Sequence, residues 1–162
     1  MTPWTRLVAC VAVTVAVDQG TKAIVTSSIG RGQSVNVFLG IDLTNVRNTG
    51  VAFGLFASQG MTGGSWLLTV LGLAALTAVG VYFWFAPSRD RLLLIALALV
   101  VGGAVGNLID RVSSGAVTDF IDVYMGPHHW PSFNVADSAI SVGIVLMALD
   151  SFRSRKHKHE TA

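Results

Sequence analysis

Two long stretches of the chain, residues 66–86 and 92–109, contain no charged residue. A helix needs about 20 predominantly apolar residues to cross about 30 Å of hydrocarbon. A third run, residues 7–25, is similar, although Asp18 and Lys22 interrupt it. Only 12% of all residues are charged and the mean hydropathy is +0.62, whereas a soluble domain is about 25% charged. The sequence therefore predicts a mostly α-helical, integral membrane protein.

A fourth run, residues 136–152, is a weaker candidate because its apolar part covers only residues 140–149. We still predict a span there, since Asp137 then lies near one end of the helix and not at the bilayer centre. Four transmembrane helices place both termini on the same side. Residues 1–152 are thus predicted to form one membrane domain, followed by a short, basic and disordered tail at 153–162.

The distribution of basic residues predicts the orientation. Arg6, Arg89, Arg91 and the basic residues of the tail fall on one side of the predicted spans. An excess of Lys and Arg near span ends marks the cytoplasmic side. Both termini are therefore expected in the cytoplasm, and residues 26–65 and 111–133 outside it. The net charge of +2 gives no argument for nucleic-acid binding.

The outer segments contain strand patterns. Apolar residues alternate strictly with others from residue 35 to residue 43, the pattern of a strand with one apolar face. A second short strand is predicted at residues 116–123. We therefore expect a small extracytoplasmic β-sheet beside the four helices.

Ionisable residues gather at the outer ends of the predicted spans. Such groups cost about 2.5–3.5 kcal/mol each at membrane depth and usually mark function. Asp18 and Lys22 stand at i and i+4, which favours a structural ion pair. Asp110 lies beside Arg111, and a carboxylate next to a guanidinium remains ionised, which suits bracing better than proton transfer.

Asp119 and Asp137 differ because no basic residue adjoins them in sequence. Asp137 fits an N-cap or first-turn acid stabilised by the helix dipole. Equally, the two carboxylates fit a pair that shares one proton, in which one activates a water molecule and the other polarises a carbonyl. The local sequence leaves both interpretations open.

Other chemistries find little support. No His lies in a predicted span, which excludes an H-E-x-x-H zinc site or a Ser-His arrangement within the membrane. Cys10 is the only cysteine, so an intrachain disulfide and a cysteine-based metal site are excluded. We predict no metal.

Four polar motifs together resemble those of a known family. They are residues 18–22 (DQGTK), 48–54 (NTGVAFG), 102–111 (GGAVGNLIDR) with 117–121 (VTDFI), and 133–140 (FNVADSAI). In order and spacing, over residues 7–152, they resemble the bacterial lipoprotein signal peptidase, or signal peptidase II.

The resemblance implies an aspartic endopeptidase of the bacterial cytoplasmic (inner) membrane, with its active site near the extracytoplasmic face. Its substrates would be diacylglyceryl-modified prolipoproteins, cut just before the lipidated Cys without metal or cofactor. Membrane lipids and peptide antibiotics of the globomycin type would be further partners, and the sheet would form a β-cradle. Asp119 and Asp137 match the catalytic positions. Site-lining or supporting positions are matched by Asn48, Gly50, Ala52, Gly103, Asn107, Asp110, Arg111, Asn134, Ala136, Asp18 and Lys22.

Two other classes of function are alternatives to this one. A small ion-coupled transporter would need polar residues near the bilayer midplane, and residues 66–86 and 92–109 carry no charge there. A non-catalytic membrane scaffold would leave Asp119 and Asp137 as helix caps. Unprocessed lipoprotein precursors that fail to accumulate when the protein is depleted would favour the scaffold.

Overall fold

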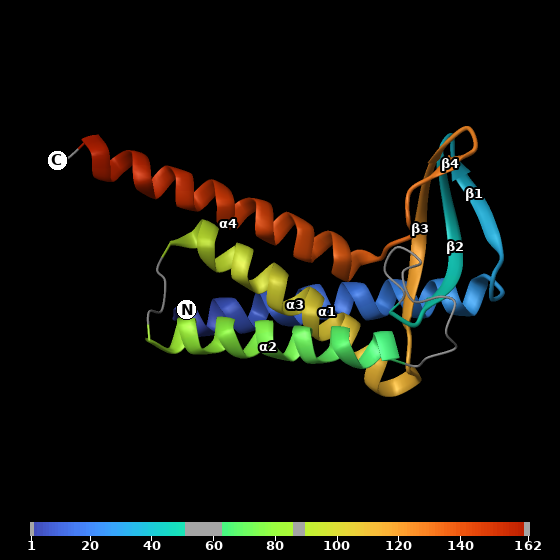
Figure 1. Ribbon diagram of the computed structural model, residues 1–162, viewed down its shortest axis with the longest axis horizontal. Helices are drawn as coiled ribbons and strands as arrows, with labels where there is room; N and C mark the ends of the chain where they lie inside the picture. The colour runs from blue at the N-terminus through green and yellow to red at the C-terminus, as the bar shows by residue number, and fades with distance from the viewer. Residues whose placement is uncertain (1, 51–62, 86–89, 161–162) are drawn as a thin grey trace.

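The computed structural model describes residues 2–50, 63–85 and 90–160. Its helices run side by side, and a small sheet lies across one end of them (Figure 1). Both ends of the described chain lie away from the sheet (Figure 1). The elements in chain order are α1 (Pro3–Ser28), β1 (Ser34–Phe38), β2 (Ile41–Asn48), α2 (Gly63–Phe85), α3 (Arg91–Ser114), β3 (Val117–Met125), β4 (His128–His129) and α4 (Val135–Glu160).

Three helices of the described chain are long and apolar enough to cross a membrane: Pro3–Ser28, Arg91–Ser114 and Val135–Arg153. This confirms the mostly helical, membrane-protein prediction. Helix α2 occupies the place of the predicted span 66–86. The count of four spans and the side that each terminus faces stay predictions.

The basic tail differs from its prediction. We expected residues after 152 to be disordered, whereas α4 continues as a helix to Glu160. Backbone hydrogen bonding propagates along a helix once it has formed, so a polar continuation of an apolar helix can remain helical.

Small residues bring the helices close together. A Cβ atom added to Gly103 of α3 would collide with the backbone carbonyl of Ala136 in α4. One at Gly143 of α4 would lie 2.7 Å from the carbonyl of Ala96 in α3. Helices in membranes associate through such close backbone approach, since lipid supplies no hydrophobic driving force between them.

We expect Gly103→Ala to destabilise the protein by about 1–3 kcal/mol, because the new methyl group overpacks the contact between α3 and α4. Gly20→Ala is the matched control, since nothing lies within 4 Å of a Cβ atom there, and Ala is the better helix former. The thermal unfolding midpoint in one detergent measures both effects. Equal midpoints for the two variants would refute this account of the packing.

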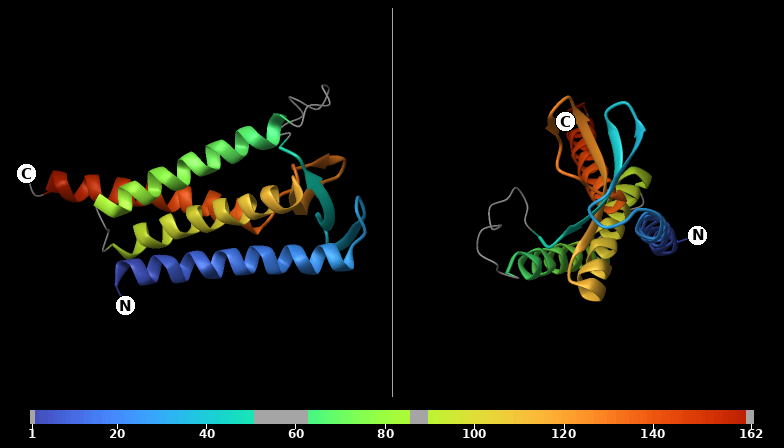
Figure 2. Two further views of the ribbon diagram at one scale, coloured as in Figure 1. Left: turned by 90° about the horizontal axis from the view of Figure 1, so that it is seen from below. Right: turned by 90° about the vertical axis from the view of Figure 1, so that its right-hand side faces the viewer.

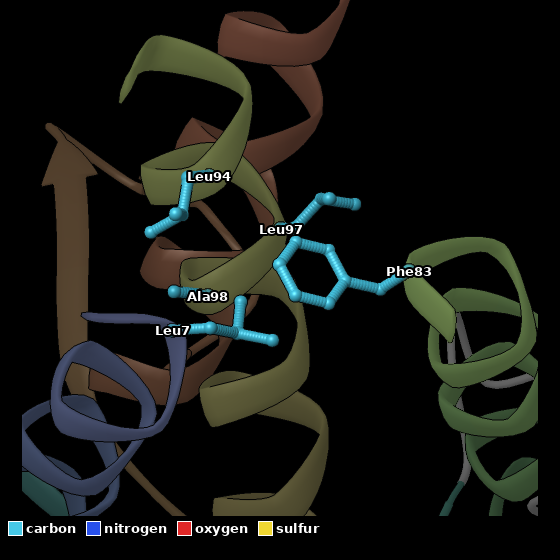
Figure 3. Packing of buried hydrophobic residues seen from close by; sticks show 5 residues of the cluster. All are labelled: Leu7, Phe83, Leu94, Leu97 and Ala98. Atoms are coloured by element: carbon cyan, nitrogen blue, oxygen red, sulfur yellow. The ribbon is translucent and has the colours of Figure 1, made fainter. Parts of the chain in front are cut away.

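A hydrophobic cluster joins the helices at the end away from the sheet. It consists of Leu7, Phe83, Leu94, Leu97 and Ala98, and the Phe83 ring of α2 points toward α3 (Figure 3). Trp4 stands edge-on to Phe83, with ring centroids 4.5 Å apart. Helices α1, α2 and α3 are therefore packed through one shared set of side chains.

The sheet is antiparallel, with strand order β1-β2-β3-β4. The predicted strand at 116–123 corresponds to β3, but the prediction of one strand over residues 35–43 was wrong. Strands β1 and β2 form a hairpin there, and Gly40 has a φ of 80°. Gly adopts positive φ without steric cost, so the chain reverses where the alternation alone suggested continuity.

The sheet is attached to the helices by a second cluster. Val25 and Ile29 at the end of α1 are buried against Phe120 of β3. This contact places β3 over the ends of the helices, as the two views in Figure 2 show. The segment before α4 is fastened to β3 as well, because the Phe133 carbonyl accepts hydrogen bonds from the N–H groups of Phe120 (3.0 Å) and Ile121 (2.8 Å).

Candidate active site

The structure brings Asp119 and Asp137 to one end of the helix bundle. Asp119 lies on β3, and Asp137 lies in the first turn of α4. Asn134, the residue before α4, contacts both carboxylates. Its Nδ2 donates to Asp119 Oδ1 at 2.7 Å, and its backbone N–H donates to Asp137 Oδ2 at 3.3 Å.

Asp119 is buried, with 3% of its surface exposed. Its second oxygen, Oδ2, accepts a hydrogen bond from Asn48 Nδ2 at 2.9 Å. Burial raises the pKa of Asp119 to about 6, and the Asp137 charge adds to this while the Asn48 hydrogen bond opposes it. Asp119 can therefore keep a proton at a pH where an ordinary aspartic acid has lost it.

Asp137 is half-buried, and its two oxygens have different partners. Oδ1 accepts a 2.8 Å hydrogen bond from Asn107 Nδ2 on α3, while Oδ2 accepts from the Asn134 backbone. Asn134 Oδ1 in turn accepts from the Asp137 N–H at 3.0 Å. This reciprocal pair is a capping box at the start of α4. The helix-cap interpretation of Asp137 therefore holds for its Oδ2 atom. Its Oδ1 atom instead contacts the side chain of Asn107 on another helix.

A buried ion-pair network supports the site. Lys22 Nζ lies 2.8 Å from Asp18 Oδ2 and 2.9 Å from Asp110 Oδ2. It also donates to Asn107 Oδ1 at 3.1 Å. One ammonium group therefore joins α1 to α3 and fixes the amide that binds Asp137.

The network corrects one expectation and confirms another. Asp18 and Lys22 do form the predicted i,i+4 pair. The sequence suggested Arg111 as the partner of Asp110, but the ion pair is with Lys22, because adjacent residues on a helix point in different directions. Asp110 Oδ2 also accepts from the Thr118 N–H at 3.1 Å, which ties α3 to β3.

Asp18 has a further role that the sequence did not reveal. Its Oδ1 accepts a 2.9 Å hydrogen bond from the Ala136 N–H, in the first turn of α4. The start of α4 is thus capped by a carboxylate 118 positions away in the chain. Ala136 is fully buried there, which leaves no room for a larger side chain.

The remaining predicted residues lie around this centre. Gly50 has a φ of 95°, and its N–H donates to Asn48 Oδ1 at 2.9 Å. Arg111 is half-buried at the end of α3, and the charges of Asp137, Asp110 and Asp119 act on its guanidinium. Ala52 falls outside the described residues.

Gln19 is a supporting residue that sequence reasoning missed. Its Nε2 lies within hydrogen-bond distance of Asp110 Oδ1 (2.9 Å), Asp18 Oδ2 (3.1 Å) and the carbonyl of Gly106 (3.1 Å). The sequence did contain a signal for this role of Gln19. A polar amide beside Asp18 in an otherwise apolar run needs hydrogen-bond partners within the protein.

An open pocket of about 310 Å³ reaches Asp119. It is lined by Val46, Arg47, Asn48, Thr49, Asp119, Pro131 and Ser132. Within the described ranges, no three or more His, Cys, Asp or Glu residues group closely enough to hold a metal ion. The pocket therefore opens onto the buried carboxyl group of Asp119.

Comparison with known proteins identifies the family. Residues 10–153 match the family described as signal peptidase (SPase) II. The chain belongs to the signal peptidase II family. A lipoprotein signal peptidase of Geobacter metallireducens is 41% identical over 148 residues, which cover 91% of this chain and 90% of that protein. One from Janthinobacterium sp. (strain Marseille) is 42% identical and covers 94% and 90% respectively.

Solved structures agree with this family assignment. A bacterial membrane enzyme determined by the in meso method matches with a TM-score of 0.81 at 29% identity, covering 94% of this chain and 90% of that chain. A second such structure matches with a TM-score of 0.77 at 30% identity, covering 89% and 90%. The chain is therefore a peptidase of a membrane-enzyme family.

Proposed function

We propose that this protein removes signal peptides from diacylglyceryl-modified prolipoproteins, and that Asp119 and Asp137 carry the catalysis. The observation that supports this most strongly is the position of Asn134, which donates hydrogen bonds to both carboxylates. Family membership and the name of its relatives, lipoprotein signal peptidase, supply the substrate class.

In the proposed mechanism, Asp119 is the protonated member of the pair. Its burial disfavours the charged form, so it donates a proton to the scissile carbonyl oxygen. Asp137 acts as the base that takes a proton from the attacking water. The C–N bond of the tetrahedral intermediate then breaks, and the leaving amine takes up the proton that Asp137 received. One hydroxyl group of the intermediate returns its proton to Asp119 as the new carboxyl group forms, which restores the pair.

The amide side chains give this pair its geometry. Asn48 and Asn134 bind the two oxygens of Asp119, and Asn107 binds Asp137. An amide Nδ2 only donates, so these contacts orient the carboxylates without supplying a competing base. Lys22, Asp18 and Asp110 act one step further away, by fixing Asn107 and the start of α4.

The membrane placement follows from the same proposal. A lipidated substrate lies at the membrane surface with its apolar signal helix in the bilayer. The carboxylates lie at the sheet end of the helices, which we place at the extracytoplasmic face of the bacterial inner membrane. Four spans and cytoplasmic termini complete this topology, since Arg6, Arg91 and the basic tail lie at the opposite end.

We expect kcat/KM to fall as the pH rises through about 6, because the free enzyme then loses the Asp119 proton that polarises the carbonyl. The activity depends on the singly protonated pair, which titrates as a unit. Initial rates on a diacylated prolipoprotein between about pH 4.5 and 8.5 measure this. A profile that stays flat from pH 5 to pH 8 would contradict the assignment of the proton to Asp119.

The substrate assignment is tested by mass spectrometry of the cleavage products. The purified protein in detergent is given one prolipoprotein in two forms, with and without the diacylglyceryl group. We expect a single cut, directly before the lipidated Cys, in the diacylated form only. Equal cleavage of both forms, or a cut elsewhere, would argue against the proposed specificity.

A further inference from the structure

A second open pocket lies at the other end of the helix bundle, between the first turns of α1 and α3. It has a volume of about 380 Å³ and is lined by Arg6, Cys10, Arg91, Leu94 and Ile95. Ligand pockets in proteins usually measure about 300–1,000 Å³. The pocket is separate from the dyad, which lies where α3 ends and α4 begins.

The pocket is apolar within, and its two arginines lie toward the helix starts. Arg6 precedes Cys10 by one helical turn, and Arg91 precedes Leu94 and Ile95 by about one turn. With a rise of 1.5 Å per residue, the arginines stand about 5–6 Å nearer the helix starts. The lining itself is almost entirely apolar, so the long arginine stems form part of the walls.

In the described residues, neither Arg6 nor Arg91 takes part in an ion pair. The neighbouring Asp90 caps α3, where its Oδ1 accepts from the N–H groups of Leu92 (2.7 Å) and Leu93 (3.4 Å). Both helices also begin here, and helix N-termini are the positive ends of the dipole.

We propose that this pocket binds one anionic phospholipid of the surrounding leaflet. The phosphate lies between the guanidinium groups of Arg6 and Arg91, and one acyl chain lies along Cys10, Leu94 and Ile95. Guanidinium pairs well with phosphate oxygens, and basic pockets between membrane helices bind anionic head groups. The site is independent of the proposed catalysis, because no residue of the dyad or its network lines it.

Native mass spectrometry of the full chain tests the proposal. The protein is released from micelles containing equal amounts of phosphatidylglycerol and zwitterionic phosphatidylcholine, and the two lipid adducts are counted. We expect mainly the phosphatidylglycerol adduct, and Arg6→Gln should lower its share about tenfold, because a charge-assisted contact to the phosphate is lost. Arg153→Gln, which removes an exposed charge on α4 outside the pocket, is the control and should leave the ratio unchanged.

A second pair of variants separates binding in the pocket from general charge attraction. Cys10→Phe fills the pocket and should remove the bound lipid, whereas Val8→Phe, at a position 62% exposed on the same helix, should not. Equal adducts of both lipids would overturn the proposal, and so would a loss of adduct in Arg153→Gln as large as in Arg6→Gln. Displacement of the lipid by inorganic phosphate alone would also contradict it, because the apolar walls require an acyl chain.

Discussion

Asp119→Asn and Asp137→Asn should each abolish cleavage of a diacylated prolipoprotein. Either change removes one member of the acid–base pair, and a positioned acid or base contributes about 10²–10⁴-fold to the rate. The residual rate of the double variant should be close to that of either single variant, because the two carboxyl groups act as a unit. Single-turnover rates in detergent, with enzyme in excess, measure the chemical step directly.

The control for this pair is Asp42→Asn. Asp42 lies on β2 of the sheet and accepts a hydrogen bond from Asn36, outside the network around the dyad. We expect it to cleave at the wild-type rate. If Asp119→Asn or Asp137→Asn remained folded and cleaved at nearly that rate, the dyad assignment would fail.

Lys22→Met should cause the largest loss of stability among single substitutions near the site. It leaves the carboxylates of Asp18 and Asp110 buried without their cation. Removal of one partner from a buried ion pair costs about 3–5 kcal/mol. Here one ammonium serves two carboxylates, so we expect an effect at the upper end of that range. The thermal unfolding midpoint in detergent is the measurement.

Arg31→Met is the matched control, because Arg31 is an exposed cation just after α1. Its loss should change stability by less than about 0.5 kcal/mol. A double variant, Lys22→Met with Asp110→Asn, should recover part of the loss, since it leaves one fewer unpaired charge. Equal unfolding midpoints for Lys22→Met and Arg31→Met would show that the network does not stabilise the fold.

The sequence predicted those features that depend on local composition. The apolar runs around Asp18 and Asp137 gave the helices that carry these residues, and the i,i+4 spacing gave the pair of Asp18 with Lys22. The family motifs gave the residues that gather around the dyad. These inferences succeed because helix formation and partition into lipid are governed by residues close together in the chain.

The partners that the sequence did not predict are separated widely along the chain. Asp18 caps the start of α4 at Ala136, and Lys22 binds Asp110. Neither contact follows from spacing, because each depends on how α1 packs against α3 and α4. The prediction of one strand over residues 35–43 was wrong for a local reason. Gly40 has a positive φ and allows a turn within an otherwise regular alternation of apolar and other residues.

The most direct test of the central claim is a structure of the enzyme with a peptide-like inhibitor whose hydroxyl group mimics the tetrahedral intermediate. Transition-state analogues bind at the groups that stabilise the transition state. We predict that this hydroxyl lies within about 3 Å of a carboxylate oxygen of both Asp119 and Asp137. An inhibitor bound elsewhere, or one that contacts only one of the two carboxylates, would contradict the proposed mechanism.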